Sequence, residues 1–64
     1  MKPGDLVVAV TGDLGIIVRE VDSGDRDLDL TTRWCDWWVL VGAGRLKGCI
    51  QSFPAQSLEL IGTF

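Results

Sequence analysis

Short apolar runs separated by turn-forming residues make up most of this chain. The runs are rich in β-branched and aromatic side chains, which is typical of strands. No segment keeps a helical period over roughly ten residues or more. The pattern therefore predicts an all-β chain with five strands, at Leu6–Val10, Ile16–Val21, Arg33–Val41, Leu46–Phe53 and Leu58–Ile61.

The connections between these runs contain the residues that turns require. Thr11–Gly15 has two glycines and joins the first two strands as an antiparallel pair. Val41–Arg45 also has two glycines and predicts a hairpin turn between the third and fourth strands. Pro54–Ser57 has the length of one helical turn, with proline at its first position. Because closure protects the edges of such short strands, we expect one domain over residues 1–64, a small five-stranded barrel with a one-turn helix before the last strand.

The segment 22–29 is polar and acidic, and it predicts a long exposed loop. An early start of the third strand, at Leu28, Leu30 and Thr31–Thr32, stays open. The acidic residues of this segment have the spacing of the first three ligands of a calcium loop. The position where that loop requires glycine is Leu30, however, and its twelfth position is Asp36 rather than glutamate. A solvated acidic loop is therefore the favoured interpretation.

All three tryptophans lie in the third predicted strand, and its pairing with the fourth decides which of them are buried. Strand alternation places Trp34 and Trp38 on one face and Trp37 on the other. With Val41 opposite Arg45, Asp36 would turn towards the core without a partner, at a cost of several kcal/mol. The register with Val41 opposite Leu46 is therefore favoured. Its core face holds Trp37, Val39, Val41, Leu46 and Ile50, and its outer face holds Trp34, Trp38, Leu40 and Phe53.

That outer set, Trp34, Trp38, Leu40 and Phe53, is the predicted partner-binding surface, because tryptophan is enriched at the energetic centres of protein interfaces. The exposed side of Leu6–Val8 is a further candidate part of it. The alternative is that the segment 22–29 or the terminal segments cover the outer aromatics. Stacking of nucleic-acid bases on them is disfavoured, since Asp36 lies between the two tryptophans.

Composition and charge restrict the classes of function. The chain has a net charge of −3, whereas nucleic-acid binders normally present a basic face. Hydrophobic residues are 47% of the 64 residues, so apolar side chains either fill a tight barrel or remain for a partner or self-association to cover. No apolar run is long enough for a membrane span, and the N-terminus does not have the pattern of a signal peptide.

Candidate chemistry is sparse in this sequence. There is no histidine, which removes the commonest general base and metal ligand. Cys35 and Cys49 alone cannot complete a zinc site, and they are interpreted as reduced apolar fillers on opposite faces. We therefore expect no catalytic residues, metal or cofactor, and a binding or structural module rather than an enzyme.

Two motifs resemble a known fold family. Pro3–Val7 followed by Gly15–Val18 resembles the first hairpin of SH3-like barrels of the KOW and Tudor type, and Phe53–Ile61 resembles their closing helical turn and last strand. Compact chains of this pattern resemble small SH3-like proteins of tailed phages. The resemblance implies an accessory virion protein, either a capsid-decorating cement protein or a neck or tail component. Its partner would be the major capsid protein or another virion protein.

The chain also departs from this family at two points. The loop Thr11–Leu14 lacks the basic residues of nucleic-acid-binding KOW domains. Trp34 and Trp38 offer two walls of a methyl-lysine cage of the Tudor type, but there is no tyrosine and the other walls are not evident. The alternatives to a virion protein are a cytoplasmic adaptor that binds nucleic acid, the ribosome or polymerase, and a peptide-reading module.

Overall fold

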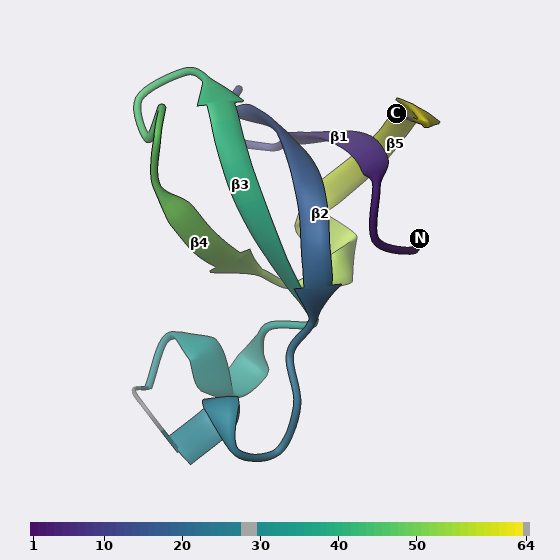
Figure 1. Ribbon diagram of the computed structural model, residues 1–64. Helices are drawn as coiled ribbons and strands as arrows, with labels where there is room; N and C mark the ends of the chain where they lie inside the picture. Colours follow the sequence, from purple (N-terminus) through teal and green to yellow (C-terminus); the bar gives the residue numbers. More distant parts are fainter. Residues whose placement is uncertain (28–29, 64) are drawn as a thin grey trace.

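The computed structural model describes residues 1–27 and 30–63, and their strands form one antiparallel sheet (Figure 1). The strand order is β4-β3-β2-β1-β5, so β4 and β5 are the edge strands. The prediction of an all-β fold with five strands and a single helical turn before the last one is confirmed. The strands are β1 (Asp5–Ala9), β2 (Leu14–Glu20), β3 (Trp37–Ala43), β4 (Ile50–Phe53) and β5 (Leu58–Thr63). The 3₁₀ turns are η1 (Asp25–Asp27), η2 (Thr32–Trp34) and η3 (Ala55–Ser57).

One face of the sheet forms the hydrophobic core. The predicted core positions Val39 and Val41 are buried, and Trp37 and Leu46 pack against the cluster. Ile50 was predicted in the core but is 55% exposed, so that prediction is wrong. The buried cluster is drawn from all five strands and consists of Val7, Ala9, Ile17, Val39, Val41, Phe53 and Leu58.

The pairing of β3 with β4 differs from both registers considered from the sequence. Trp37 lies opposite Phe53, and Leu40 lies opposite Ile50. This register turns Phe53 inward, where it is 9% exposed, so its predicted place on the outer face is wrong. Residues that lie directly opposite each other on paired strands point to the same face of the sheet. Phe53 therefore lies on the core side with Trp37.

The loop between β3 and β4 is longer than the predicted hairpin turn because a residue outside the hairpin holds it. The backbone N–H of Leu46 donates to the Asp13 carboxylate at 3.3 Å, and Asp13 belongs to the β1–β2 turn. Gly44 has a φ of +116° and passes so close that an added Cβ would lie 2.3 Å from Asp13 Oδ1. Pairing with β4 consequently resumes further along, where the N–H of Val41 donates to the carbonyl of Cys49.

The strand β3 also begins later than predicted, at Trp37. Trp34 lies in η2, and Asp36 precedes the strand with its carboxylate accepting a 2.7 Å hydrogen bond from the N–H of Ala55. The cost of burying an unpaired Asp36, which decided between the predicted registers, therefore does not arise. The open prediction of an early start is wrong at Leu30 and Thr31–Thr32, which form a turn and the beginning of η2, and its remaining residue, Leu28, lies outside the described residues.

The β2–β3 connection, residues 21–36, extends beyond one end of the sheet and contains η1 and η2 (Figure 1). One of its contacts with the sheet is made by Thr32, whose hydroxyl lies 3.3 Å from that of Ser52 in β4. Among the described residues, no helix has the length and apolar character needed to cross a membrane.

Candidate functional site

The side of the sheet opposite the core is covered with aliphatic side chains. We call this surface the outer face. Five of its seven members are between 42% and 55% exposed, and Leu6 and Ile16 are half-buried. All five strands contribute to the outer face, which consists of Leu6, Leu14, Ile16, Val18, Leu40, Ile50 and Ile61.

The members of the outer face are neighbours in the sheet. Ile16 lies opposite both Leu6 of β1 and Leu40 of β3, and Leu40 in turn lies opposite Ile50. A shallow depression of about 330 Å³ is lined by five side chains of the outer face, Leu6, Leu14, Ile16, Leu40 and Ile61. Since paired residues on one face of adjacent strands are in contact distance, the outer face is one continuous apolar surface.

This surface exists because β1 and β2 are apolar on both sides. Ile17 is 1% exposed in the core while Ile16 and Val18 on either side of it lie on the outer face. A strand that is apolar at successive positions is typical of a sheet covered on both faces. The run Ile16–Val18 was therefore a signal in the sequence for this site, although the tryptophans were the residues singled out.

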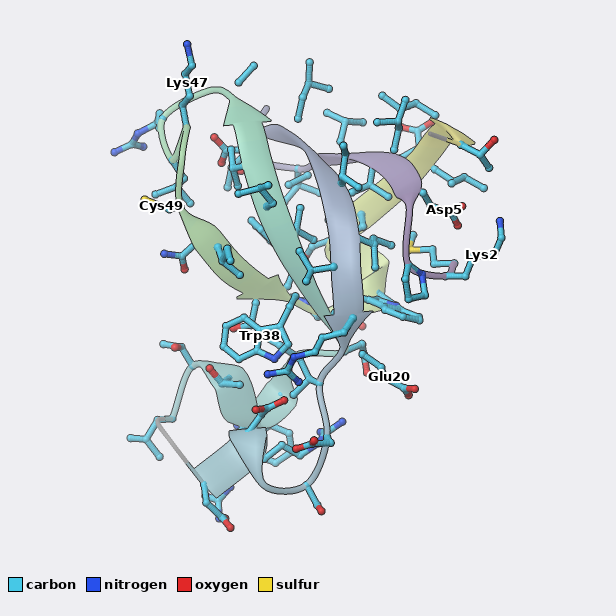
Figure 2. All side chains as sticks on the ribbon, viewed as in Figure 1. Lys2, Asp5, Glu20, Trp38, Lys47 and Cys49 are labelled. Carbon is cyan, nitrogen blue, oxygen red and sulfur yellow. The ribbon has the colours of Figure 1, made fainter. Side chains whose placement is uncertain are left out.

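Trp38 lies at one end of the outer face, between the sheet and the β2–β3 connection (Figure 2). Its indole Nε1 donates a 3.0 Å hydrogen bond to Asp25 of η1. The guanidinium of Arg19 lies 5.6 Å from the centre of the ring and forms an ion pair with the same carboxylate. These three side chains fix the β2–β3 connection to the sheet and hold the indole in one orientation.

Asp25 is the electrostatic centre of this contact. Its carboxylate accepts hydrogen bonds from Arg19 and Trp38 and from the backbone N–H of Asp22 at 3.1 Å. These donors hold the pKa of Asp25 well below its usual range, with the Arg19 hydrogen bond as the largest cause, followed by the one from Trp38. Asp25 is therefore ionised at neutral pH although the residue is only 9% exposed.

The four residues predicted to bind a partner do not form a single surface. Leu40 lies within the outer face, whereas Phe53 is in the core. Trp34 is 77% exposed, but it lies in η2, where the guanidinium of Arg33 is 6.0 Å from its ring. Trp38 is half-buried, since Asp25 of the acidic segment covers part of it. The alternative in which that segment shields an outer aromatic therefore applies to Trp38.

The two cysteines are free thiols with different surroundings. Cys35 is buried, and its Sγ donates to the carbonyl of Thr31 at 3.0 Å. Cys49 is exposed, so the prediction that it fills apolar space is wrong. Within residues 1–27 and 30–63, no group of three or more His, Cys, Asp or Glu side chains is placed to hold a metal ion.

No protein-family model matches this chain, and neither the curated proteins nor the solved structures include a match. The surface of the molecule therefore carries the functional interpretation. The outer face offers apolar contact over all five strands, and the Trp38 cluster with Arg19 and Asp25 adds a polar group at one end.

Proposed function

We propose that this protein is a non-enzymatic structural interaction protein that docks a protein partner through its outer face. The observation that carries the proposal is the continuous aliphatic surface, in which Leu40 is 43% exposed and Ile50 is 55% exposed. Contiguous apolar patches on small proteins are costly in water, and they often mark interaction sites. A partner that covers the outer face would remove this cost.

The chemistry of the outer face suits a protein surface better than a small ligand. Sites for small molecules combine apolar walls with a few polar groups that fix the orientation of the ligand. The depression formed by Leu14, Leu40 and Ile61 has aliphatic walls and is shallow. Its shape and chemistry therefore favour the broad apolar contact of a protein interface, with the partly exposed Trp38 ring as an aromatic anchor at one end.

The topology supports the finer part of this proposal, an SH3-like barrel. The sheet runs as a meander from β1 to β4, and β5 returns to pair with β1 after the single turn η3. With the motifs Pro3–Val7 and Phe53–Ile61, this order supports a place among the small SH3-like proteins of tailed phages. We therefore propose an accessory virion protein, on the capsid or in the neck or tail, with a virion protein as partner.

Incorporation into phage particles tests this proposal. The chain and two variants, Leu40→Asp on the outer face and Val10→Asp as a control, would be supplied during phage assembly. Val10 is 80% exposed and lies outside the outer face, so it controls for the added charge. Mass spectrometry of purified particles should find the wild-type chain and the control in equal amounts, and Leu40→Asp reduced at least about tenfold, which corresponds to roughly 1.4 kcal/mol of binding.

Two results would contradict the proposal. Absence of the wild-type chain from particles would exclude a virion role. Incorporation of Leu40→Asp at the level of the control would exclude the outer face as the docking surface. Circular dichroism of each purified variant confirms that any loss does not come from unfolding.

A further inference from the structure

The β2–β3 connection, residues 21–36, is a compact surface loop in its described part. Its two ends meet where the backbone N–H of Val21 donates to the carbonyl of Asp36 at 2.9 Å. Val21, Thr32 and Cys35 are buried, so the connection packs with side chains of its own. Surface loops of roughly 6–16 residues with these properties are frequently functional. An exposed side chain on such a loop loses little freedom when a partner binds, because the backbone beneath it is already held.

Trp34 is the largest side chain that the described part of the connection exposes. It is 77% exposed in η2, and the guanidinium of Arg33 lies 6.0 Å from the centre of its ring. Leu30 of the same connection is 76% exposed. Tryptophan and arginine are enriched at the energetic centres of protein interfaces. The connection therefore presents an aromatic and cationic pair to solvent at a fixed place.

A second arginine lies beside this pair. The Nη1 of Arg26 donates a 3.0 Å hydrogen bond to the carbonyl of Arg33. Both arginines line one depression of about 320 Å³, together with Asp27 and Leu30. Among the described residues, neither arginine forms an ion pair. The two arginines outweigh the one aspartate, so the depression has an excess of positive charge in a chain whose net charge is −3.

We propose that Arg26, Arg33 and Trp34 form a binding site for a carboxylate side chain on an acidic segment of a protein. Guanidinium groups bind carboxylates through charge-assisted hydrogen bonds, and an arginine without an ion pair has N–H donors to offer. The exposed ring of Trp34 and the side chain of Leu30 would contact an apolar residue next to the carboxylate. This site goes beyond the proposed function, because none of its residues belongs to the outer face.

The charges around the site favour a protein segment over a nucleic acid. Asp22 and Asp27 are exposed on the same connection, and the chain as a whole is acidic. A nucleic acid carries a phosphate at each nucleotide, so it would meet these carboxylates as well as the arginines. One carboxylate side chain can contact the arginines alone and avoids most of this repulsion.

Nuclear magnetic resonance of the indole Nε1–H groups tests the site. The full chain is titrated with a short peptide of alternating Glu and Leu, and with a matched peptide that has Gln in place of Glu. The Glu peptide should shift the Trp34 indole signal, which Trp34→Phe identifies, with a Kd of the order of 1 mM. The Gln peptide should bind at least about tenfold more weakly, because it lacks the charge. The Trp38 indole, which donates to Asp25, should not shift.

Substitutions of single side chains locate the contact. Arg33→Gln should weaken binding of the Glu peptide at least about fivefold. The matched control Arg45→Gln, at an exposed arginine of the β3–β4 loop, should leave it unchanged. Leu40→Asp on the outer face should also leave it unchanged, so that failure of this site and failure of the proposed function are distinguishable. An unmoved Trp38 signal in each variant shows that the connection keeps its place on the sheet.

Several results would overturn this site. A Trp34 signal that stays unshifted up to about 10 mM Glu peptide would exclude it. Equal affinity for the Glu and Gln peptides, or equal affinity of Arg33→Gln and Arg45→Gln for the Glu peptide, would exclude the carboxylate contact. A single-stranded oligothymidylate that shifts the Trp34 signal at lower concentration than the Glu peptide would assign the site to nucleic acid and overturn the proposal.

Discussion

Phe53 provides the sharpest test of the β3–β4 register, with Trp34 as its comparison, because the predicted register places both side chains on the outer face and the structure buries only Phe53. Phe53 is 9% exposed and packs in the core, whereas Trp34 is 77% exposed in η2. We therefore expect Phe53→Leu to destabilise the protein and Trp34→Ala to leave its stability nearly unchanged. Under a register with Phe53 on the outer face, the Phe53 substitution would have little effect.

The expected magnitudes follow from burial. A buried phenylalanine costs about 3–5 kcal/mol when it is replaced by alanine. The whole stability of 64 residues is of the order of 3–10 kcal/mol, so Phe53→Ala is expected to unfold much of the population. Phe53→Leu keeps most of the volume and should cost about 1–1.5 kcal/mol, which lowers Tm by roughly 4–12 °C. Trp34→Ala should stay within about 0.5 kcal/mol, or about 4 °C.

Thermal unfolding followed by circular dichroism measures both variants against the wild type. The variants and the wild type are compared at one and the same low protein concentration, since any association of the folded state raises the apparent stability. A Trp34→Ala chain that loses more stability than Phe53→Leu would refute the placement of these residues and the register that produces it.

Two further substitutions test close contacts in the fold. Gly15→Ala should lower the free energy of unfolding in urea by about 1–3 kcal/mol, because its Cβ would lie 2.5 Å from a methyl carbon of Val39. The control Gly42→Ala, whose Cβ has ordinary contacts, should change it by no more than about 0.5 kcal/mol. Equal effects would contradict the packing of β2 on β3. The lowered pKa of Asp25 should contribute stability that is fully present above its unfolded value of 3.8 and is lost as the pH falls below that value. Asp25→Asn should therefore lower the urea midpoint of unfolding at about pH 7, and the midpoint of the variant should fall less between about pH 7 and about pH 3 than that of the wild type. Tryptophan fluorescence measures both midpoints. An unchanged pH profile would show that the carboxylate does not hold the indole.

The sequence was sufficient for the strands and insufficient for their alignment. Apolar runs and turn residues predict five strands and the turn at Pro54–Ser57, because these signals are local. The side chain that reshapes the β3–β4 loop belongs to Asp13, which is 33 residues away from Leu46. A hairpin rule that considers only the residues of the turn cannot include such an acceptor, and a shift in register exchanges the faces of Phe53 and Ile50.

The candidate surface, too, could be predicted from the sequence only in part. Leu40 could be predicted as exposed, and the apolar runs Leu6–Val8 and Ile16–Val18 already indicated strands with two apolar faces. The tryptophans misled because Trp34, Trp37 and Trp38 were assumed to share one strand. Trp34 lies instead in η2, within the β2–β3 connection, and Trp38 is partly covered by Asp25.

The sequence by itself determined the all-β class, the five strands and the excess of aliphatic side chains, since each depends on composition and spacing within short segments. Only the tertiary structure decided which side of each strand faces the core. That choice depends on contacts between distant segments, such as Asp13 with the β3–β4 loop and Asp36 with Ala55. With these contacts in place, the surface that remains open is the aliphatic outer face around Leu40. Trp37 packs against the core, Trp38 lies at one end of the outer face, and Trp34 lies on the β2–β3 connection.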